Sequence, residues 1–150
     1  MLEKVLVGLD GSATASAAAR YAMDLAKPHG AKLMLLVVVP PVPMVQDFYG
    51  VGAVDLGRLE EAGWAQARPV EEELRERGAD VEASVRFGAP AEVLARTAQE
   101  WGADLVVVGS RGQGLVRRMM LGSVSDRLVH IAERPVLVFH DSSHQTPPPP

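Results

Sequence analysis

The chain has 150 residues, a length that suits one domain with a single core. Apolar residues make up 47% and charged residues 23% of it, and the net charge of −4 argues against a nucleic acid or a membrane surface as the main partner. With no cysteine, the chain excludes a disulfide framework and a thiolate metal site. No apolar run could span a bilayer and no signal-peptide pattern opens the chain, so we expect a cytoplasmic protein.

The first elements are two apolar runs with a helical pattern between them. Residues 4–10 and 32–39 are predicted strands buried on both faces. The helix between them is expected over about 13–27, and Ser12 is placed to cap its first turn. Prolines forbid the second strand from continuing, and residues 40–54 are predicted to form a long loop.

The middle of the chain predicts a helix, a strand and a second helix. Residues 55–77 carry an apolar stripe at helical spacing, and Pro69 inside this stretch predicts a kink or a break. Residues 80–87 alternate between apolar and polar side chains, as in a strand with one wet face at a sheet edge. Pro90 suits the first turn of the next helix, and Gly102 ends it.

The last part of the chain predicts a central strand over 105–108, a helix over about 123–132 and a short last strand from Pro135 to Phe139. Residues 141–150 hold no core residue and end in four prolines, so we expect a disordered tail after a domain of residues 1–140. Strands alternate with helices throughout. The expected fold is therefore α/β, an open five-stranded parallel sheet with helices on both faces.

The most informative stretch, residues 108–125, is a glycine-rich loop between a predicted strand and a predicted helix start. Such a junction exposes backbone N–H groups next to the positive end of a helix dipole, so a phosphate is the expected occupant. The loop carries arginines, Arg111 among them, and no acid. If the first and fourth strands are neighbours, Asp10 faces this loop across one crevice and could accept hydrogen bonds from a ribose. This arrangement describes a nucleotide site.

Simpler interpretations are open at this point. Asp10 could only cap the first helix, Ser123 could be only an N-cap, and the glycines could form an ordinary turn. The sequence has no Gly-x-x-x-x-Gly-Lys-Ser/Thr phosphate loop, and its glycine spacing does not fit a dinucleotide fingerprint. It shows no metal-ligand set on a helix, and we name no catalytic residue.

One spacing is similar to that of a known family. Gly109 and Gly112 have two residues between them and are followed, after nine further residues, by Gly122 and Ser123. This spacing resembles the Gly-x2-Gly-x9-Gly-Ser/Thr pattern of ATP-binding universal stress proteins. The resemblance covers about residues 1–140. It includes the opening residues 4–12 (Lys-Val-Leu-Val-Gly-Leu-Asp-Gly-Ser), the segment 104–112 and the closing residues 134–138.

The resemblance implies a Rossmann-like fold of the adenine nucleotide alpha hydrolase type and a stress-response regulator that binds ATP, accompanied by Mg²⁺ at the phosphates. It also implies a homodimer that pairs the last strand, residues 135–139, across a two-fold axis. Slow ATP hydrolysis, autophosphorylation, or a dimerisation module without a ligand are the alternatives. The residues that it places at the nucleotide are Gly8, Leu9, Asp10, Val38, Val108, Gly109, Arg111, Gly112, Gly122, Ser123, Val124 and Ser125.

Overall fold

The computed structural model describes residues 1–40, 55–111 and 122–141, and its centre is a five-stranded parallel sheet in the order β3-β2-β1-β4-β5. The predicted fold class is confirmed. The strands are β1 (Lys4–Leu9), β2 (Lys32–Val39), β3 (Val81–Phe87), β4 (Leu105–Gly109) and β5 (Val136–Phe139). The helices are α1 (Ala13–Ala26), the 3₁₀ turn η1 (Lys27–His29), α3 (Leu56–Glu76), α4 (Pro90–Trp101) and α5 (Ser123–Ile131).

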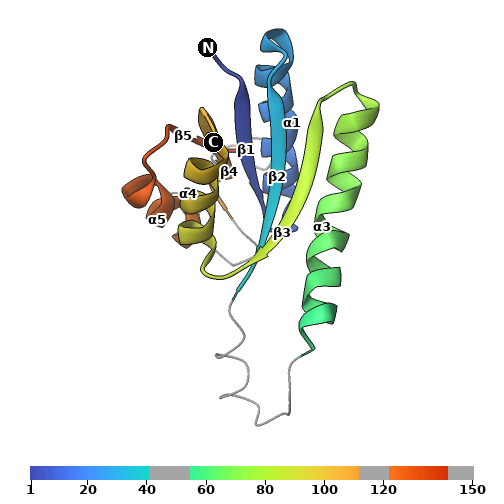
Figure 1. Ribbon diagram of the computed structural model, residues 1–150, viewed down its shortest axis with the longest axis vertical. Helices are drawn as coiled ribbons and strands as arrows, with labels where there is room; N and C mark the ends of the chain where they lie inside the picture. Colours follow the sequence, from blue (N-terminus) through green and yellow to red (C-terminus); the bar gives the residue numbers. More distant parts are fainter. Residues whose placement is uncertain (41–54, 112–121, 142–150) are drawn as a thin grey trace, which may run out of the picture.

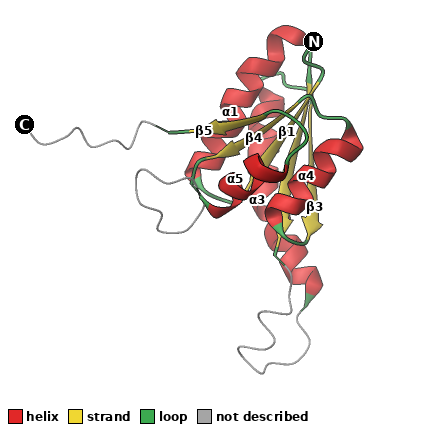
Figure 2. Cartoon of the chain, turned by 90° about the vertical axis from the view of Figure 1, so that its left-hand side faces the viewer, coloured by secondary structure: helices red, strands yellow, loops and turns green. Residues whose placement is uncertain are grey.

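The helices form a layer on each face of the sheet. Helices α1 and α3 cover one face and α4 and α5 cover the other, and Figure 2 shows α4 and α5 in front of the strands (Figures 1 and 2). Along β1, Val5 and Val7 pack in the first layer and Leu6 in the second. Both faces of the central strands are therefore buried, which explains why their sequences are continuous apolar runs.

The strand order reverses between β1 and β4. From β1 the chain proceeds outward through β2 to β3, and it then crosses the sheet to β4 and β5 on the other side of β1. Val5, Leu6 and Val7 of β1 are in parallel register with Leu105, Val106 and Val107 of β4. A ligand site in an open parallel sheet lies outside the carboxyl ends of the strands at such a reversal. The condition set for Asp10 and the glycine loop to share a crevice is thus met.

Helix α1 begins as its sequence predicts. The Ser12 side chain caps it by accepting a hydrogen bond from the N–H of Ala15 at 3.1 Å. Asp10 is therefore not the cap of this helix, and that interpretation is wrong. Alanines buried along α1 let the helix lie close to the sheet, since they add no bulk between backbone and strand. They are Ala15, Ala18, Ala19, Ala22 and Ala26.

The sequence predicts either a kink or a break in α3 at Pro69. The helix is continuous from Leu56 to Glu76, so the break considered there is absent. Pro69 and Ala65, whose carbonyl loses its helical donor, are both exposed, and water can take the place of the missing N–H group. Strand β3 lies at the sheet edge, as the alternation in residues 80–87 predicts. None of the described helices is both long and apolar enough to cross a membrane.

Candidate functional site

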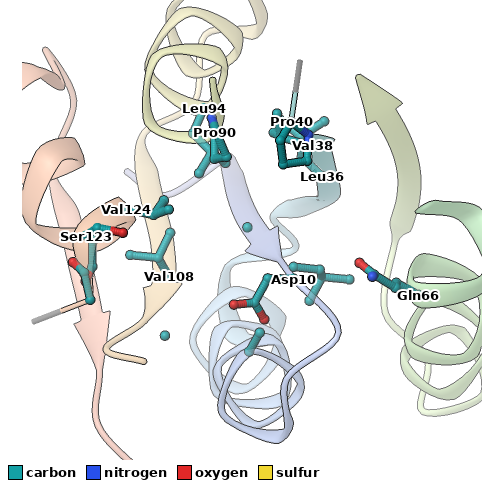
Figure 3. A pocket seen from close by; sticks show the side chains of 16 residues that line it. Asp10, Leu36, Val38, Pro40, Gln66, Pro90, Leu94, Val108, Ser123 and Val124 are labelled. Carbon is teal, nitrogen blue, oxygen red and sulfur yellow. The ribbon is translucent and has the colours of Figure 1, made fainter. Parts of the chain in front are cut away.

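A pocket of about 390 Å³ opens at the carboxyl ends of β1, β2 and β4 (Figure 3). This volume falls in the range of roughly 300–1,000 Å³ that is typical of small-molecule sites. Most of the lining is hydrocarbon, with a few polar groups. The lining residues are Gly8, Leu9, Asp10, Ala15, Leu36, Val38, Pro40, Gln66, Pro90, Leu94, Val108, Gly109, Gly122, Ser123, Val124 and Ser125.

The apolar wall comes from the sheet face that α4 and α5 cover. Leu36 and Val38 are two residues apart on β2, so they share one face, and Val108 of β4 and Leu94 of α4 pack in the same layer. Val38 is only partly buried, whereas Leu36 is fully buried. The wall therefore offers a hydrocarbon surface, against which an aromatic ring can pack.

Two glycines make room for the pocket and the helices around it. A Cβ atom on Gly8 would lie 3.1 Å from Cγ1 of Val108 and 3.2 Å from a methyl carbon of Leu94, both of which line the pocket. A Cβ atom on Gly109 would lie 3.0 Å from Cγ2 of Thr14, in the first turn of α1. Side chains at these positions would narrow the pocket and push α1 away from the end of β4.

The first turn of α5 supplies the polar end of the pocket. Gly122 is its N-cap, with extended backbone (φ −59°, ψ 155°) and no side-chain cap, so Ser123 is the first helical residue and not the cap. Within the described part of the chain, the N–H groups of Ser123, Val124 and Ser125 have no hydrogen-bond acceptor. These donors carry the positive end of the helix dipole and their residues line the pocket, as an anion site would require.

The position of Gly122 is fixed by hydrogen bonds to the strands. Its N–H donates to the carbonyl oxygen of Ser110 at 2.7 Å, and the N–H of Ser110 donates to the carbonyl oxygen of Phe139 at 2.8 Å. Ser110 is buried, with 2% of its surface exposed. The start of α5 is thus held to the ends of β4 and β5, and its free donors keep a defined orientation toward the pocket.

Helix α5 is also held against α4. Arg127 donates to a carboxylate oxygen of Glu92 at 3.0 Å, and this hydrogen bond holds the pKa of Glu92 below its ordinary value. Both α4 and α5 line the pocket, so the ion pair joins two of its walls.

The carboxylate of Asp10 lies in the pocket directly after β1. Its Oδ1 accepts a hydrogen bond from the N–H of Ser12 at 2.9 Å, which orients the carboxylate. Its Oδ2 has no hydrogen bond to any residue that the structure describes, and the side chain is exposed to the pocket. One carboxylate oxygen is therefore available to accept from a hydroxyl group of a ligand.

The two serines of α5 have different hydroxyl chemistry. The Ser125 hydroxyl donates to the carbonyl oxygen of Gly122 at 3.0 Å, and its side chain is almost fully buried. Ser123 is exposed at the start of α5 (Figure 3). Among the described residues the Ser123 hydroxyl has no hydrogen-bond partner, so of these two hydroxyls it is the one that can donate to a phosphate without losing a hydrogen bond to this part of the chain.

All but two of the residues proposed from the sequence line this pocket. The exceptions are Arg111, which is partly buried but not among the lining residues, and Gly112, which lies outside the described residues. Their roles as ligand contacts stay predictions. The proline-rich loop over 41–54, most of the glycine-rich loop (112–121) and the tail over 142–150 also lie outside the described residues.

Several lining residues have no place in the glycine pattern. Leu36 could have been found, because it is two residues before Val38 on the same strand and must share its face. The others come from helices or loop ends whose approach depends on tertiary packing, and the sequence carries no local signal for them. They are Ala15, Pro40, Gln66, Pro90 and Leu94.

Comparison with known proteins identifies the class. The model of the universal stress protein family matches residues 1–140, and the chain belongs to this family. A universal stress protein of Thermus aquaticus is 35% identical over 142 residues, which cover 92% of this chain and 98% of that protein.

Solved structures agree with this assignment. The hypothetical protein MJ0577 superposes with a TM-score of 0.80 at 26% identity, covering 94% of this chain and 97% of that one. A universal stress protein solved in complex with cAMP has a TM-score of 0.73 at 28% identity, covering 93% and 98%. At least one structural relative therefore binds an adenine nucleotide.

Proposed function

We propose that this protein is an ATP-binding regulator of the stress response that changes its state with the bound nucleotide. The observation that carries the proposal is the pairing of the unclaimed N–H groups of α5 with the free carboxylate oxygen of Asp10 across an apolar pocket. Phosphates need donors, a ribose needs an acceptor and a purine needs an apolar wall. The pocket offers all three in one continuous space, and a relative in complex with cAMP supports an adenine nucleotide as the ligand.

Magnesium fits this proposal as a companion of the phosphates. Within the described residues, no group of three His, Cys, Asp or Glu side chains could hold a metal ion. The pocket has one carboxylate among its described lining residues, that of Asp10. Mg²⁺ is commonly held by one or two carboxylates together with substrate phosphates, so the ion would bind with the nucleotide.

The proposal includes a homodimer through the outer edge of β5. Strand β5 is the last in the sheet order and pairs with β4 on one side. The carbonyl oxygens of Pro135 and Phe139 accept from the N–H groups of Val106 in β4 and of Ser110 directly after it, so by alternation Val136 and Val138 direct their N–H and C=O groups outward. An edge of this kind is a template for a second strand. The cytoplasmic location also stays a prediction.

The first experiment asks what the purified protein carries. Small molecules released by heat are identified by mass spectrometry, and the emptied protein is titrated by calorimetry with ATP, AMP, cAMP and GTP in the presence of Mg²⁺. We expect ATP to bind in the micromolar range. No binding of any adenine nucleotide at millimolar concentration would overturn the proposal and leave a dimerisation module without a ligand. ATP turnover near one per second, the low end for enzymes, would instead favour an ATP hydrolase.

A further inference from the structure

The polar groups of the pocket are separated along its length. Ser123 and the start of α5 lie at one side of the view in Figure 3, Gln66 lies at the other, and Asp10 lies between them. Leu36 and Val38 on β2, which also line the pocket, are apolar and lie apart from Gln66 in this view. If the phosphates of a nucleotide occupy the α5 side and the ribose reaches Asp10, the base extends toward Gln66.

Gln66 reaches the pocket from the opposite helix layer. It belongs to α3, which packs on the other face of the sheet from α4 and α5. Gly63, three residues earlier, is buried, and a Cβ atom there would lie 2.7 Å from Cγ1 of Val85 and 3.4 Å from Cγ2 of Val39. This close approach holds the adjacent turn of α3 against the ends of β2 and β3. The Gln66 side chain is thereby brought over the strand ends into the pocket (Figure 3).

The Gln66 amide has no partner in the described part of the chain. The side chain is partly buried, yet none of the hydrogen bonds between described residues involves its oxygen or nitrogen. The inward side of α3 is otherwise formed by small or apolar residues, among them Gly63, Ala67, Val70 and Leu74. A primary amide that lines a mostly apolar pocket and has no partner among the described residues is suited to hydrogen bonding with a ligand, because it offers one acceptor and two donors.

We propose that Gln66 is a specificity-determining residue that selects a 6-aminopurine. This inference rests on the proposed function and deepens it. An adenine edge presents an amino donor beside a ring-nitrogen acceptor, which a glutamine amide matches with two hydrogen bonds. On the edge formed by position 6 and N7, guanine and hypoxanthine present two acceptors, and the amide can satisfy only one of them. Gln66 thus favours the adenine base, because its carbonyl oxygen accepts from the 6-amino group and its NH₂ group donates to N7.

The test compares two nucleotides in two variants by calorimetric titration with Mg²⁺. The nucleotides are ATP and purine riboside triphosphate, which lacks the 6-amino group. Gln66→Leu keeps the side-chain size and a good helix former but removes the amide. Gln99→Leu on α4 is the matched control, because Gln99 is exposed and does not line this pocket. We expect the wild type to prefer ATP about tenfold, the scale of one lost hydrogen bond, and Gln66→Leu to bind both nucleotides within about twofold of each other.

Each outcome decides a separate point. If the wild-type protein binds neither nucleotide, the proposed function fails and this inference fails with it. If the wild type binds ATP and Gln66→Leu keeps the full preference, the inference is wrong while the proposed function stands. An equal loss of both nucleotides, with melting temperature and circular dichroism matching those of Gln99→Leu, would also overturn it, because Gln66 would then only shape the pocket.

A second variant covers the case in which Gln66→Leu does not fold. Gln66→Glu keeps the length and a carbonyl-type acceptor for the 6-amino group but cannot donate to the ring nitrogen. We expect ATP affinity to fall about tenfold and the preference over purine riboside triphosphate to remain in part. Unchanged ATP affinity in Gln66→Glu would contradict the proposed pair of hydrogen bonds.

Discussion

The two ends of the sheet treat their backbone groups in opposite ways. At the amino end, Oδ2 of Asp104 accepts from the N–H of Glu3 at 2.8 Å and of Lys4 at 2.9 Å. There, Nζ of Lys4 also donates to the carbonyl oxygen of Trp101 at 3.0 Å. At the carboxyl end, the N–H groups that open α5 have no acceptor among the described residues. Where the chain supplies its own acceptor the end is closed, and where no described residue supplies one a ligand can bind.

An aspartate lies at each end of the sheet, and the two carboxylates differ in how many N–H groups of the chain they accept from. The hydrogen bonds from the N–H groups of Glu3 and Lys4 lower the pKa of Asp104, because they stabilise the ionised carboxylate. Asp10 uses one oxygen to orient itself on Ser12 and keeps the other for the pocket. One aspartate thus closes a strand end, and the other leaves it partly open. Three changes test this difference.

The largest effect is expected from filling the unclaimed donors of α5 with an internal acceptor. Gly122→Asp places a carboxylate at the N-cap, where Asp is favoured and the existing backbone angles are compatible with it. The carboxylate would occupy the N–H groups and repel phosphate. We expect ATP affinity to fall at least ~100-fold, equivalent to about 2.7 kcal/mol, while the melting temperature is unchanged or higher. Calorimetry and thermal melting measure the two quantities.

The control for Gly122→Asp is Gly122→Asn, which caps the helix equally well without a charge. It separates occupation of the donors from charge repulsion, so its loss of affinity should lie between those of the wild type and Gly122→Asp. If Gly122→Asp bound ATP as the wild type does, the start of α5 would not be the phosphate site.

The fold was predictable because each element leaves a pattern within its own residues. Unbroken apolar runs mark β1, β2 and β4 as strands buried on both faces, and the alternation over 80–87 marks β3 as an edge. The consequence of Pro69 was not predictable, since it depends on the exposure of the helix side on which the proline lies. Patterns specify the elements, while packing decides how a local irregularity is accommodated.

The pocket was predictable only where its residues follow strand ends. Asp10 and Gly109 come directly after predicted strands, and the reversal of strand order brings those ends together. Gln66 and Leu94 come from the middle of helices, and only tertiary packing places them at the strand ends. Arg111, which the resemblance also places at the nucleotide, directly follows Ser110 and is not among the lining residues, so its contact with a ligand stays a prediction.

The second effect concerns another set of outward backbone groups, those on the free edge of β5. Val138→Pro removes one outward N–H group and leaves the hydrogen bonds toward β4 intact, because Val106 and Ser110 donate to Pro135 and Phe139 and not to Val138. In a two-fold dimer the loss occurs twice. We expect the dimer dissociation constant to rise about tenfold or more, as measured by analytical ultracentrifugation.

The control for this edge is Val138→Thr, which keeps the N–H group and the β-branched shape. It should dimerise nearly as the wild type does. A wild-type protein that is monomeric at high micromolar concentration would contradict the dimer itself. An equal dissociation constant in Val138→Pro would show that the copies meet elsewhere, for example over Tyr21, whose ring is exposed and lies 5.4 Å from that of Phe139.

The smallest effect is expected from a substitution at the amino end of the sheet, which Asp104 closes. Asp104→Asn keeps the side-chain shape but accepts the N–H groups of Glu3 and Lys4 with a neutral oxygen, which makes weaker hydrogen bonds. We expect the melting temperature at pH 7 to fall by about 2–4 °C and ATP affinity to remain within twofold. A large loss of ATP affinity would mean that the two ends of the sheet are not independent.

The difference in melting temperature between the wild type and Asp104→Asn should depend on pH, because the pKa of Asp104 is lowered in the folded protein. A lowered pKa means that the ionised carboxylate stabilises the fold fully above the ordinary value of about 3.9, and that this contribution is lost as the pH falls through the folded-state pKa. The gap in melting temperature between the wild type and Asp104→Asn should therefore be constant from pH 7 to about pH 5 and close on further acidification. A gap in melting temperature that widened below pH 4 would show that the N–H groups of Glu3 and Lys4 do not favour the ionised carboxylate of Asp104. The amino end of the sheet would then not be closed by this carboxylate.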